Sequence, residues 1–556
     1  MGFRLFDNPD FKGDAVKQWN AEKYNSDPQY ASQKGLIRPY RVGVSCGSCH
    51  IAFNPTRPPL DKENPKWENL ASAIGNQYIS EGKVFAPNVK EGGFFWEMLK
   101  TQPRGTSDTS RIATDHINNP NAINPIFELG ERMWIQHEEE IAGESLLIPG
   151  TKSPMPVAHI LKDGADSIGV PGATIRVYIN IGMYSQHWLQ QHQALLGLTP
   201  QKPFSIKTAQ ENSVYWNATQ AKVGNIAEFF KKLTSFRLAD APGGGDYITK
   251  DESVMKRGKL VFAEECATCH SSKQPPSGTD AEEWFAGEVM KPDFLTNNFL
   301  SDERRYPLTR IKTNAARAFG TNAKRGNVWS WFSSETYKKL ESPGEIDYWN
   351  PYTDAQEKFP IPAGGRGYYR TPSLVSCWSS APFFHNNALG KFTGDPSVAG
   401  RMEAFNDAAQ KLLWPEKRDG KNSIWRTSQE CQITVNAAYL PPVMKKALAL
   451  EIDPDGFFRI GHIPAGTPIN LLANLNSEMP LTELVPLLVK VKHALIDIKL
   501  KVLTGEAAKE VLKREVAPAL LKASNCPDLI EDRGHDFGTR LPDSDKLALI
   551  EYLKTL

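Results

Sequence analysis

Two segments of the chain share the pattern Cys-x-x-Cys-His, beginning at residues 46 and 266. Two thiols three positions apart on one turn can add to the two vinyl groups of haem, and the adjacent imidazole then reaches the iron from the same side. Zinc sites and redox pairs also use Cys-x-x-Cys, but neither requires a histidine directly after the second cysteine in both copies. We therefore predict two covalently bound haem c groups. The residues expected to hold them are Cys46, Cys49, His50, Cys266, Cys269 and His270.

The sixth ligand of each iron must come from elsewhere in the chain. Nine of the 11 histidines lie outside the motifs, and His535 is the best candidate for the second haem. It lies shortly before the C-terminal helix, where a small cytochrome domain places its second axial ligand. Methionine is the rival, with Met402, Met444 and Met479 available, and it would give the haem a higher potential than two histidines.

No comparable histidine stands out for the first haem. If its sixth position is open, the first haem is the reactive centre and the second is an electron reservoir. His187, next to Trp188, is the best candidate for a group beside that position, although a structural role is at least as common for such a histidine.

Three cysteines remain outside the motifs, namely Cys377, Cys431 and Cys526. In an oxidising compartment, one disulfide and one buried thiol would account for this odd number. The sequence leaves the pairing open.

The composition narrows the class of protein. A length of 556 residues allows two or more domains. The formal net charge of +1 gives no field that favours nucleic acid or an anionic membrane. We find no run of about 18 apolar residues and expect no transmembrane helix. Haem c is attached outside the cytoplasm and the chain opens without a signal-like apolar stretch, so we expect a periplasmic or secreted protein whose export signal is missing from this sequence.

The elements that must position the motifs differ between the two halves. Residues 241–246 (Ala-Pro-Gly-Gly-Gly-Asp) have the composition of a linker or a sharp loop. We place the domain boundary there, with an N-terminal haem domain over 1–245 and a C-terminal cytochrome c-like haem domain over 246–556.

In the C-terminal region two helices are expected to surround the haem. Acidic residues at 251 and 252 mark a helix start, and an apolar face that includes Val261 and Phe262 leads into the second motif. Pro542 marks the start of a terminal helix whose apolar residues share one face. These two helices are predicted to cross, and Gly258 would allow a close approach.

The first motif lacks such helices. Gly35 and Pro39 precede it and three prolines follow it, so we expect an irregular pocket built from loops. The fold class predicted for the whole chain is mainly α with much irregular loop structure and scattered short hairpins, as two cytochrome c-like haem domains with long insertions.

Several segments resemble a known superfamily. Residues 369–374 (Tyr-Arg-Thr-Pro-Ser-Leu), 381–387 (Ala-Pro-Phe-Phe-His-Asn-Asn) and 534–538 (Gly-His-Asp-Phe-Gly) look like the signature of di-haem bacterial cytochrome c peroxidases and their MauG relatives. Residues 38–45, 118–125 and 177–182 are similar to its enlarged branch, which contains rubber oxygenase RoxA and the di-haem fatty-acid dioxygenases of the oleate 10S-lipoxygenase type.

The resemblance implies a function for each haem. The N-terminal haem, held by His50, would bind dioxygen at its free axial position, and the C-terminal haem would have His270 and His535 as its two axial ligands. Trp188 and Phe204 would lie beside the oxygen-binding haem. Arg370 would pair with a haem propionate, although a surface ion pair is almost as common. His385 would have a structural role or would contact the residues that bind the iron.

The substrates of this branch are apolar and unsaturated, either a cis-monounsaturated fatty acid such as oleate or polyisoprene. The chain is shorter than expected for the rubber enzyme, which favours a fatty acid. The other expected partners are dioxygen and a redox partner protein, with no nucleic acid, and a calcium ion is left open as a further cofactor.

We therefore expect a haem-dependent dioxygenase that acts at the double bond or the allylic position of its substrate. A di-haem peroxidase that reduces hydrogen peroxide is the first alternative, and it predicts methionine ligation of the second haem. An electron-transfer cytochrome is the second alternative, and it would not bind carbon monoxide when reduced.

Overall fold

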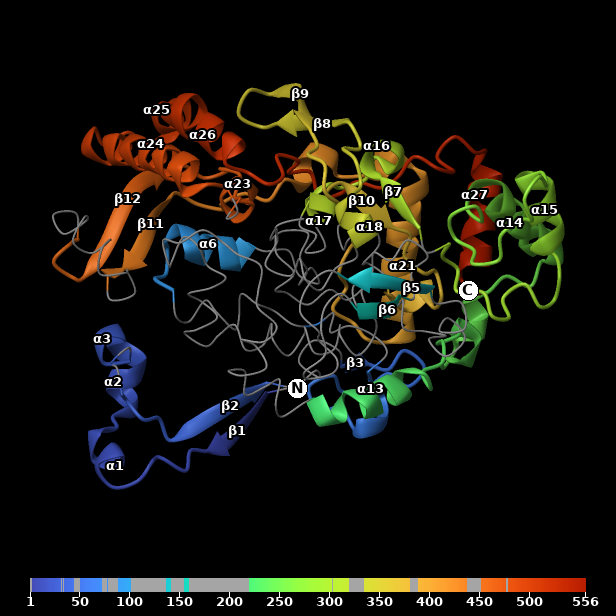
Figure 1. The fold of residues 1–556 in the computed structure, drawn as a ribbon, viewed down its shortest axis with the longest axis horizontal. Helices are drawn as coiled ribbons and strands as arrows, with labels where there is room; N and C mark the ends of the chain where they lie inside the picture. Colours follow the sequence, from blue (N-terminus) through green and yellow to red (C-terminus); the bar gives the residue numbers. More distant parts are fainter. Residues whose placement is uncertain are drawn as a thin grey trace.

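A computed structural model of the chain shows helices and two-stranded antiparallel sheets joined by much irregular chain (Figure 1). This mixture agrees with the expected helices, hairpins and long loops. The residues that the structure describes are 3–31, 33, 35–44, 51–72, 78, 89–101, 137–141, 155–159, 220–302, 304–319, 335–380, 389–437, 452–476 and 479–556. The first Cys-x-x-Cys-His motif lies outside them.

The α-helices vary from single turns to one of twenty residues. They are α1 (Asp14–Gln18), α2 (Ala21–Ser26), α3 (Pro28–Ala31), α6 (Phe94–Thr101), α13 (Val223–Phe230), α14 (Glu252–Glu265), α15 (Ala281–Glu288), α16 (Leu308–Ile311), α17 (Ala316–Phe319), α18 (Glu335–Lys338), α19 (Cys377–Ser380), α21 (Val398–Leu413), α23 (Asn470–Ala473), α24 (Leu481–Leu500), α25 (Gly505–Val511), α26 (Ala517–Lys522) and α27 (Asp543–Leu553). Shorter helical turns lie at Trp67–Asn69, Gln220–Lys222, Leu238–Asp240, Gly244–Tyr247, Pro415–Lys417, Gly420–Ser423 and Leu512–Val516.

The strands form antiparallel pairs. These are β1 (Phe3–Asp7) with β2 (Tyr40–Val44), β3 (Ala52–Phe53) with β4 (Leu70–Ala71), β5 (His137–Ile141) with β6 (Met155–His159), β7 (Arg305–Pro307) with β10 (Tyr368–Arg370), β8 (Glu345–Asn350) with β9 (Ala355–Pro360), and β11 (Cys431–Asn436) with β12 (Phe457–Ile463).

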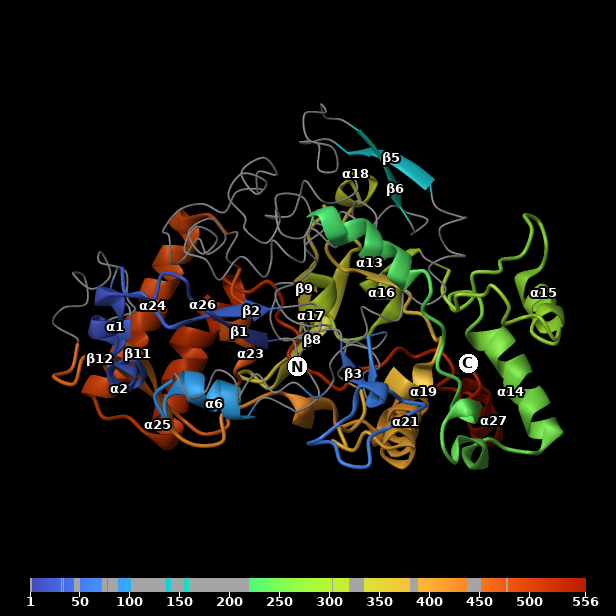
Figure 2. The same cartoon turned by 90° about the horizontal axis from the view of Figure 1, so that it is seen from below.

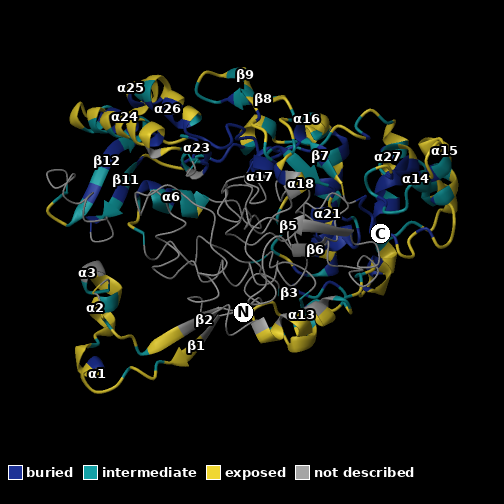
Figure 3. Ribbon diagram, viewed as in Figure 1, coloured by how far each residue is buried: buried dark blue, intermediate teal, exposed yellow. Residues whose placement is uncertain are grey.

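Helices α14 and α27 cross at close range, as the sequence predicts. A Cβ atom on Gly258 would lie 2.1 Å from the carbonyl oxygen of Ala548 in α27, so only glycine permits this approach. Near the crossing, the ring of Phe262 meets that of Tyr552 edge to face, with centroids 5.3 Å apart. The inner faces of both helices are buried (Figure 3).

Two hydrophobic cores lie at opposite ends of the molecule (Figures 1 and 2). The first, which we call the α14 core, joins α14 and α27 to α21 and α19 and includes Phe262, Trp378 and Met402. The second, the α24 core, packs α24–α26 on the β11–β12 pair, and α6 contributes Phe94 to it. The domain boundary at 245/246 stays a prediction.

The segment at residues 241–246 is a tight turn that packs on its own neighbours. Ala241 and Gly244 are buried, and a Cβ atom on Gly244 would lie 1.9 Å from the carbonyl oxygen of Leu238. Of the two alternatives that its composition allows, the structure shows the sharp loop.

The expected disulfide is wrong. Cys377, Cys431 and Cys526 are all free and buried. They belong to three different hydrophobic clusters, and sequence composition alone carries no information on which cluster each joins.

Among the described residues no helix is long and apolar enough to cross a membrane.

Candidate functional site

The second Cys-x-x-Cys-His motif forms the turn that follows α14. The carboxylate of Asp251 caps the start of the helix by accepting from the amides of Ser253 and Val254. At the other end, the backbone amides of Cys269 and His270 donate to the carbonyl oxygen of Cys266, at 3.1 and 2.8 Å. This turn places two partly exposed thiols and the imidazole of His270 at the end of one rigid helix.

The two thiols are poor nucleophiles as they stand. Burial raises the pKa of Cys266 to about 12, and the nearby charge of Glu265 adds to this effect. The pKa of Cys269 is also raised, again mainly by burial. Redox-active cysteine pairs need a lowered thiol pKa, so these environments disfavour a dithiol redox site. Among the described residues no group of three or more His, Cys, Asp or Glu side chains could hold a metal ion.

His270 lies deep in the protein and stays neutral near pH 7. Burial lowers its pKa to about 4, against the opposing influence of Asp302 and of the backbone carbonyls of Leu300 and Pro372. Its Nδ1 is buried and, within the described part of the chain, forms no hydrogen bond of regular geometry, although those two carbonyls face the ring. A neutral imidazole held in this way is available as a nitrogen ligand.

His535 faces the same place from a distant part of the sequence. Burial lowers its pKa to about 3, and the next causes are the charges of His270 and Arg418. The amide of Gly538 donates to the carboxylate of Glu265 at 3.0 Å, so the segment that carries His535 contacts the end of α14 just before the second motif. Each ring keeps some accessible surface although protein surrounds it deeply. The site therefore offers two thiols, from Cys266 and Cys269, and two neutral imidazoles, from His270 and His535.

Residues 369–374 form a wall beside His270. The hydroxyl of Ser301 donates to the carbonyl of Thr371 at 2.8 Å, and the hydroxyl of Ser373 donates to the carbonyl of Phe299 at 2.6 Å. These bonds fix residues 371–373 against residues 299–301, and this contact explains why Pro372 and Leu300 both face the imidazole. Arg370 is part of this wall, and it ends β10 opposite Arg305 of β7.

Asp302 links the motif to the wall and is a residue that sequence reasoning missed. It is fully buried, its amide donates to the carbonyl of Cys269 at 2.8 Å, and its carboxylate accepts a hydrogen bond from Tyr306. The pKa of Tyr306 is raised by burial and by this carboxylate, so the phenol stays protonated. A single acidic residue between a motif and a short strand carries no sequence signal that would have identified it.

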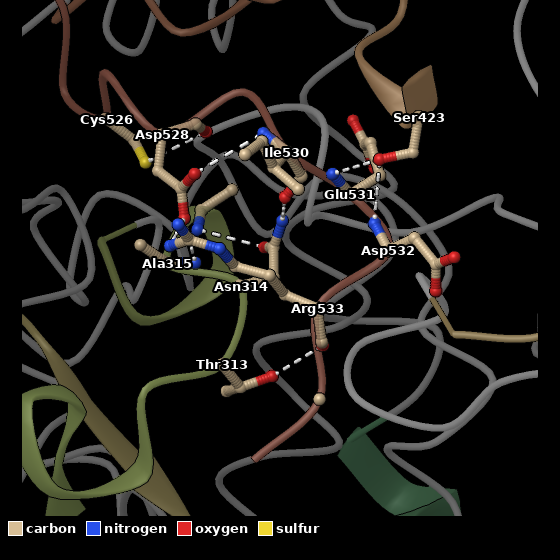
Figure 4. A network of polar contacts seen from close by, with 12 residues as sticks. Thr313, Asn314, Ala315, Ser423, Cys526, Asp528, Ile530, Glu531, Asp532 and Arg533 are labelled. Carbon is tan, nitrogen blue, oxygen red and sulfur yellow. Dashed lines mark hydrogen bonds and ion pairs between the residues drawn. The ribbon is translucent and has the colours of Figure 1, made fainter. Parts of the chain in front are cut away.

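The segment that carries His535 is anchored by side chains from two other parts of the chain (Figure 4). The amide of Asn314 donates to the carbonyl of Ile530 at 2.7 Å, and the hydroxyl of Thr313 donates to the carbonyl of Arg533 at 2.9 Å. Ser423 accepts from the amides of the two residues that follow Ile530, both at 3.0 Å. The loop before α27 is therefore held in one path up to the histidine.

The remaining candidates fall into two groups. Two of the rival ligands are described, of which Met402 is a fully buried packing residue of α21 in the α14 core and Met479 lies partly buried just before α24. The other group lies outside the described residues and comprises Cys46, Cys49, His50, His187, Trp188, Phe204, His385 and Met444. No protein-family model, curated protein or solved structure matches this chain.

Proposed function

We propose that the chain is a di-haem c-type dioxygenase that inserts dioxygen at the double bond or the allylic position of an apolar unsaturated lipid. The observation that carries the proposal is that burial keeps both His270 and His535 neutral, and that the charge of His270 acts on His535. The bond from the amide of Gly538 to Glu265 joins the His535 segment to the residue before Cys266.

The residues of the second motif fit a covalently attached haem. The turn after α14 presents two thiols with the spacing that thioether formation requires, directly before an imidazole. His270 and His535 would supply the two axial nitrogens, and residues 371–373 would hold the ring of His270. In this proposal the crossing of α14 and α27 is the frame of a cytochrome c-like domain over 246–556.

The first motif would hold the reactive group. Cys46, Cys49 and His50 repeat the same donor set, and the proposal leaves the sixth position there open. When bound, the haem of the first motif would supply activation of dioxygen and that of the second would store an electron. Trp188 and Phe204 would line the pocket and exclude water from the reacting lipid.

An unsaturated fatty acid such as oleate is the proposed substrate, and polyisoprene is the alternative within the same class. Both call for an apolar pocket that aligns a double bond. We place the protein in the periplasm or outside the cell, because haem c is attached there. The resemblance of residues 369–374 and 534–538 to the di-haem superfamily supports this assignment.

A haem count tests the cofactor part of the proposal. The pyridine haemochrome of the purified protein should report two haems per chain, and the Cys266→Ala, Cys269→Ala double variant should lose one of them. Cys377→Ala is the control, because Cys377 is also a free cysteine but lies outside both motifs. Retention of both haems by the double variant would refute the assignment of the second motif.

Oxygen uptake with isotopically labelled dioxygen tests the reaction. A labelled hydroperoxide of oleate, identified by mass spectrometry, is the expected product. Labelled carbonyl fragments from a polyisoprene emulsion would establish the rubber-type reaction instead. No uptake with either substrate, together with rapid consumption of hydrogen peroxide by the reduced protein, would overturn the oxygenase and support a peroxidase.

A further inference from the structure

Arg418 lies where the chain turns back after α21. Its Nε donates to the carbonyl of Lys411 at 2.7 Å, and its Nη2 donates to the carbonyl of Leu412 at 2.8 Å. These carbonyls belong to the last turn of α21, where no further helical amide follows to satisfy them. The guanidinium therefore caps the C-terminal end of α21, and its positive charge suits the helix dipole there.

The same guanidinium also reaches the segment that carries His535. Its Nη1 donates to the carbonyl of Gly534 at 3.2 Å, and its Nη2 donates to the carbonyl of His535 at 3.1 Å. These two carbonyls belong to the peptide groups on either side of the His535 Cα atom. Holding both peptide groups restricts the backbone dihedrals of His535, and these dihedrals set the direction of its imidazole.

Gly534 allows the guanidinium to come this close. A Cβ atom at this position would lie 3.1 Å from Nη2 of Arg418 and 3.0 Å from a methyl carbon of Leu412. The guanidinium therefore packs directly against the backbone of the residue before His535. A side chain at position 534 would push the arginine away from this peptide or move the peptide itself.

Only arginine can make this set of contacts. Its planar fork has five N–H donors, and four carbonyls are bound here by three of its nitrogen atoms. A lysine ammonium is a single point that can reach only one side of the arrangement. The charges of Asp532 and Asp536 lie nearby and compensate the half-buried guanidinium.

We propose that Arg418 is a positioning residue that fixes the orientation of His535 as an axial ligand of the second haem. This inference rests on the proposed function, since it takes His535 to be that ligand. Arg418 ties the end of α21 to the backbone around the ligand, and in this way it keeps the imidazole at the distance and angle that ligation needs. Without it, His535 would leave the iron for part of the time.

The test compares Arg418→Gln, Arg418→Lys and Gly534→Ala in the purified haem-loaded protein. The matched control is Arg257→Gln. Arg257 binds Asp545 through two bonds of 2.8 and 2.7 Å, and these bonds join α14 to α27 outside the His535 segment. The readouts are electron paramagnetic resonance of the oxidised second haem, carbon monoxide binding to the reduced protein, and thermal unfolding.

We expect all three test variants to lose part of the low-spin signal of the second haem and to bind carbon monoxide at this haem, with Arg418→Lys no better than Arg418→Gln. Arg257→Gln should lower the unfolding temperature without either spectroscopic change. If Arg418→Gln does not fold, Gly534→Ala decides, because it keeps the arginine and adds one methyl group, which meets the guanidinium and a methyl carbon of Leu412.

Two results overturn the inference, and they differ from a failure of the proposed function. The inference falls if the wild type has a second haem with two histidine ligands and the test variants keep its spectrum. It also falls if Arg257→Gln changes that spectrum to the same extent, because Arg418 would then act only on general stability. The proposed function itself falls, and the inference with it, if the wild type shows no such haem.

Discussion

The α14 core and the α24 core use similar buried side chains at opposite ends of the molecule, but they differ in what lies beside them (Figures 1 and 2). In the α14 core, two helices touch through Gly258, and the second motif and the His535 segment both adjoin the end of α14. In the α24 core, a long helix packs on a hairpin, and His462 at its edge is partly exposed and pairs with Glu430 at 3.2 Å.

This difference teaches how directly each core supports the candidate site. Leu495 in α24 packs on the hairpin, and the same core includes Leu529 and Ile530 at the start of the segment that leads to His535. The α14 core has the additional task of holding a motif and a distant histidine in one place. Disturbing either core should lower stability, and damage to the α14 core should have the larger effect on the proposed haem, because this core adjoins the second motif itself.

The largest effect is expected from truncating one large side chain in each core. Phe262 is fully buried in the α14 core and Leu495 is almost fully buried in the α24 core. Phe262→Ala should cost about 3–5 kcal/mol of unfolding free energy and Leu495→Ala about 2–5 kcal/mol, from lost burial and the cavity that remains. Denaturant unfolding measures both, and absorption spectra of the proposed haem should change more for Phe262→Ala than for Leu495→Ala. A haem spectrum altered equally by both variants would remove the distinction between the cores.

A second pair of variants adds one methyl group to a helix. In Gly258→Ala the new Cβ meets the backbone of α27, so we expect a loss of about 1–3 kcal/mol from overpacking. In Gly287→Ala of α15 nothing lies within 4 Å of the new atom, and better helix propensity should stabilise the protein by up to about 1 kcal/mol. Thermal unfolding should therefore shift in opposite directions. Equal shifts would mean that α14 and α27 do not pack this closely.

The helix caps give a third comparison. Asp251 accepts two backbone amides at the start of α14, whereas Thr504 at the start of α25 makes no side-chain cap bond. Asp251→Ala should cost about 1 kcal/mol, and Thr504→Ala should cost clearly less. Chemical denaturation of the two variants measures the difference. A larger cost at Thr504 would contradict the local structure of both helix starts.

The smallest effect is the pH dependence of the ion pair between Arg257 of α14 and Asp545 of α27. Pairing with Arg257 lowers the pKa of Asp545 from its usual 3.8. A carboxyl group with a lowered folded-state pKa adds stability above its unfolded pKa and loses it as the pH falls through the folded value. We expect a loss below about pH 4 that stays under about 1 kcal/mol, because solvent screens the half-exposed Arg257.

The control for this effect is Asp545→Asn. Near pH 7 the variant should be slightly less stable than the wild type, and at low pH the two should have the same unfolding free energy. Urea unfolding at several pH values measures it. An unchanged acid dependence in the variant would mean that the Arg257–Asp545 pair does not contribute.

Much of the α14 side of the molecule could be predicted locally. The helix start at Asp251, the end of the helix at the motif, the start of α27 after Pro542 and the close approach at Gly258 all agree with the sequence analysis. Each depends on neighbours in the chain, on helical periodicity or on the absence of a side chain. The free state of the three remaining cysteines was not predictable in this way, because it depends on which core each one enters.

The sequence by itself determined the donor types and their spacing, because a turn of Cys-x-x-Cys-His is fixed by a few adjacent residues. Tertiary structure alone decided that the His535 segment contacts the end of α14, that Pro372 and Leu300 face the imidazole of His270, and that Arg418 holds the backbone on both sides of His535. All of these contacts except that of Leu300 join segments more than a hundred residues apart. Their cause is the packing of distant elements, and local residue patterns do not encode it.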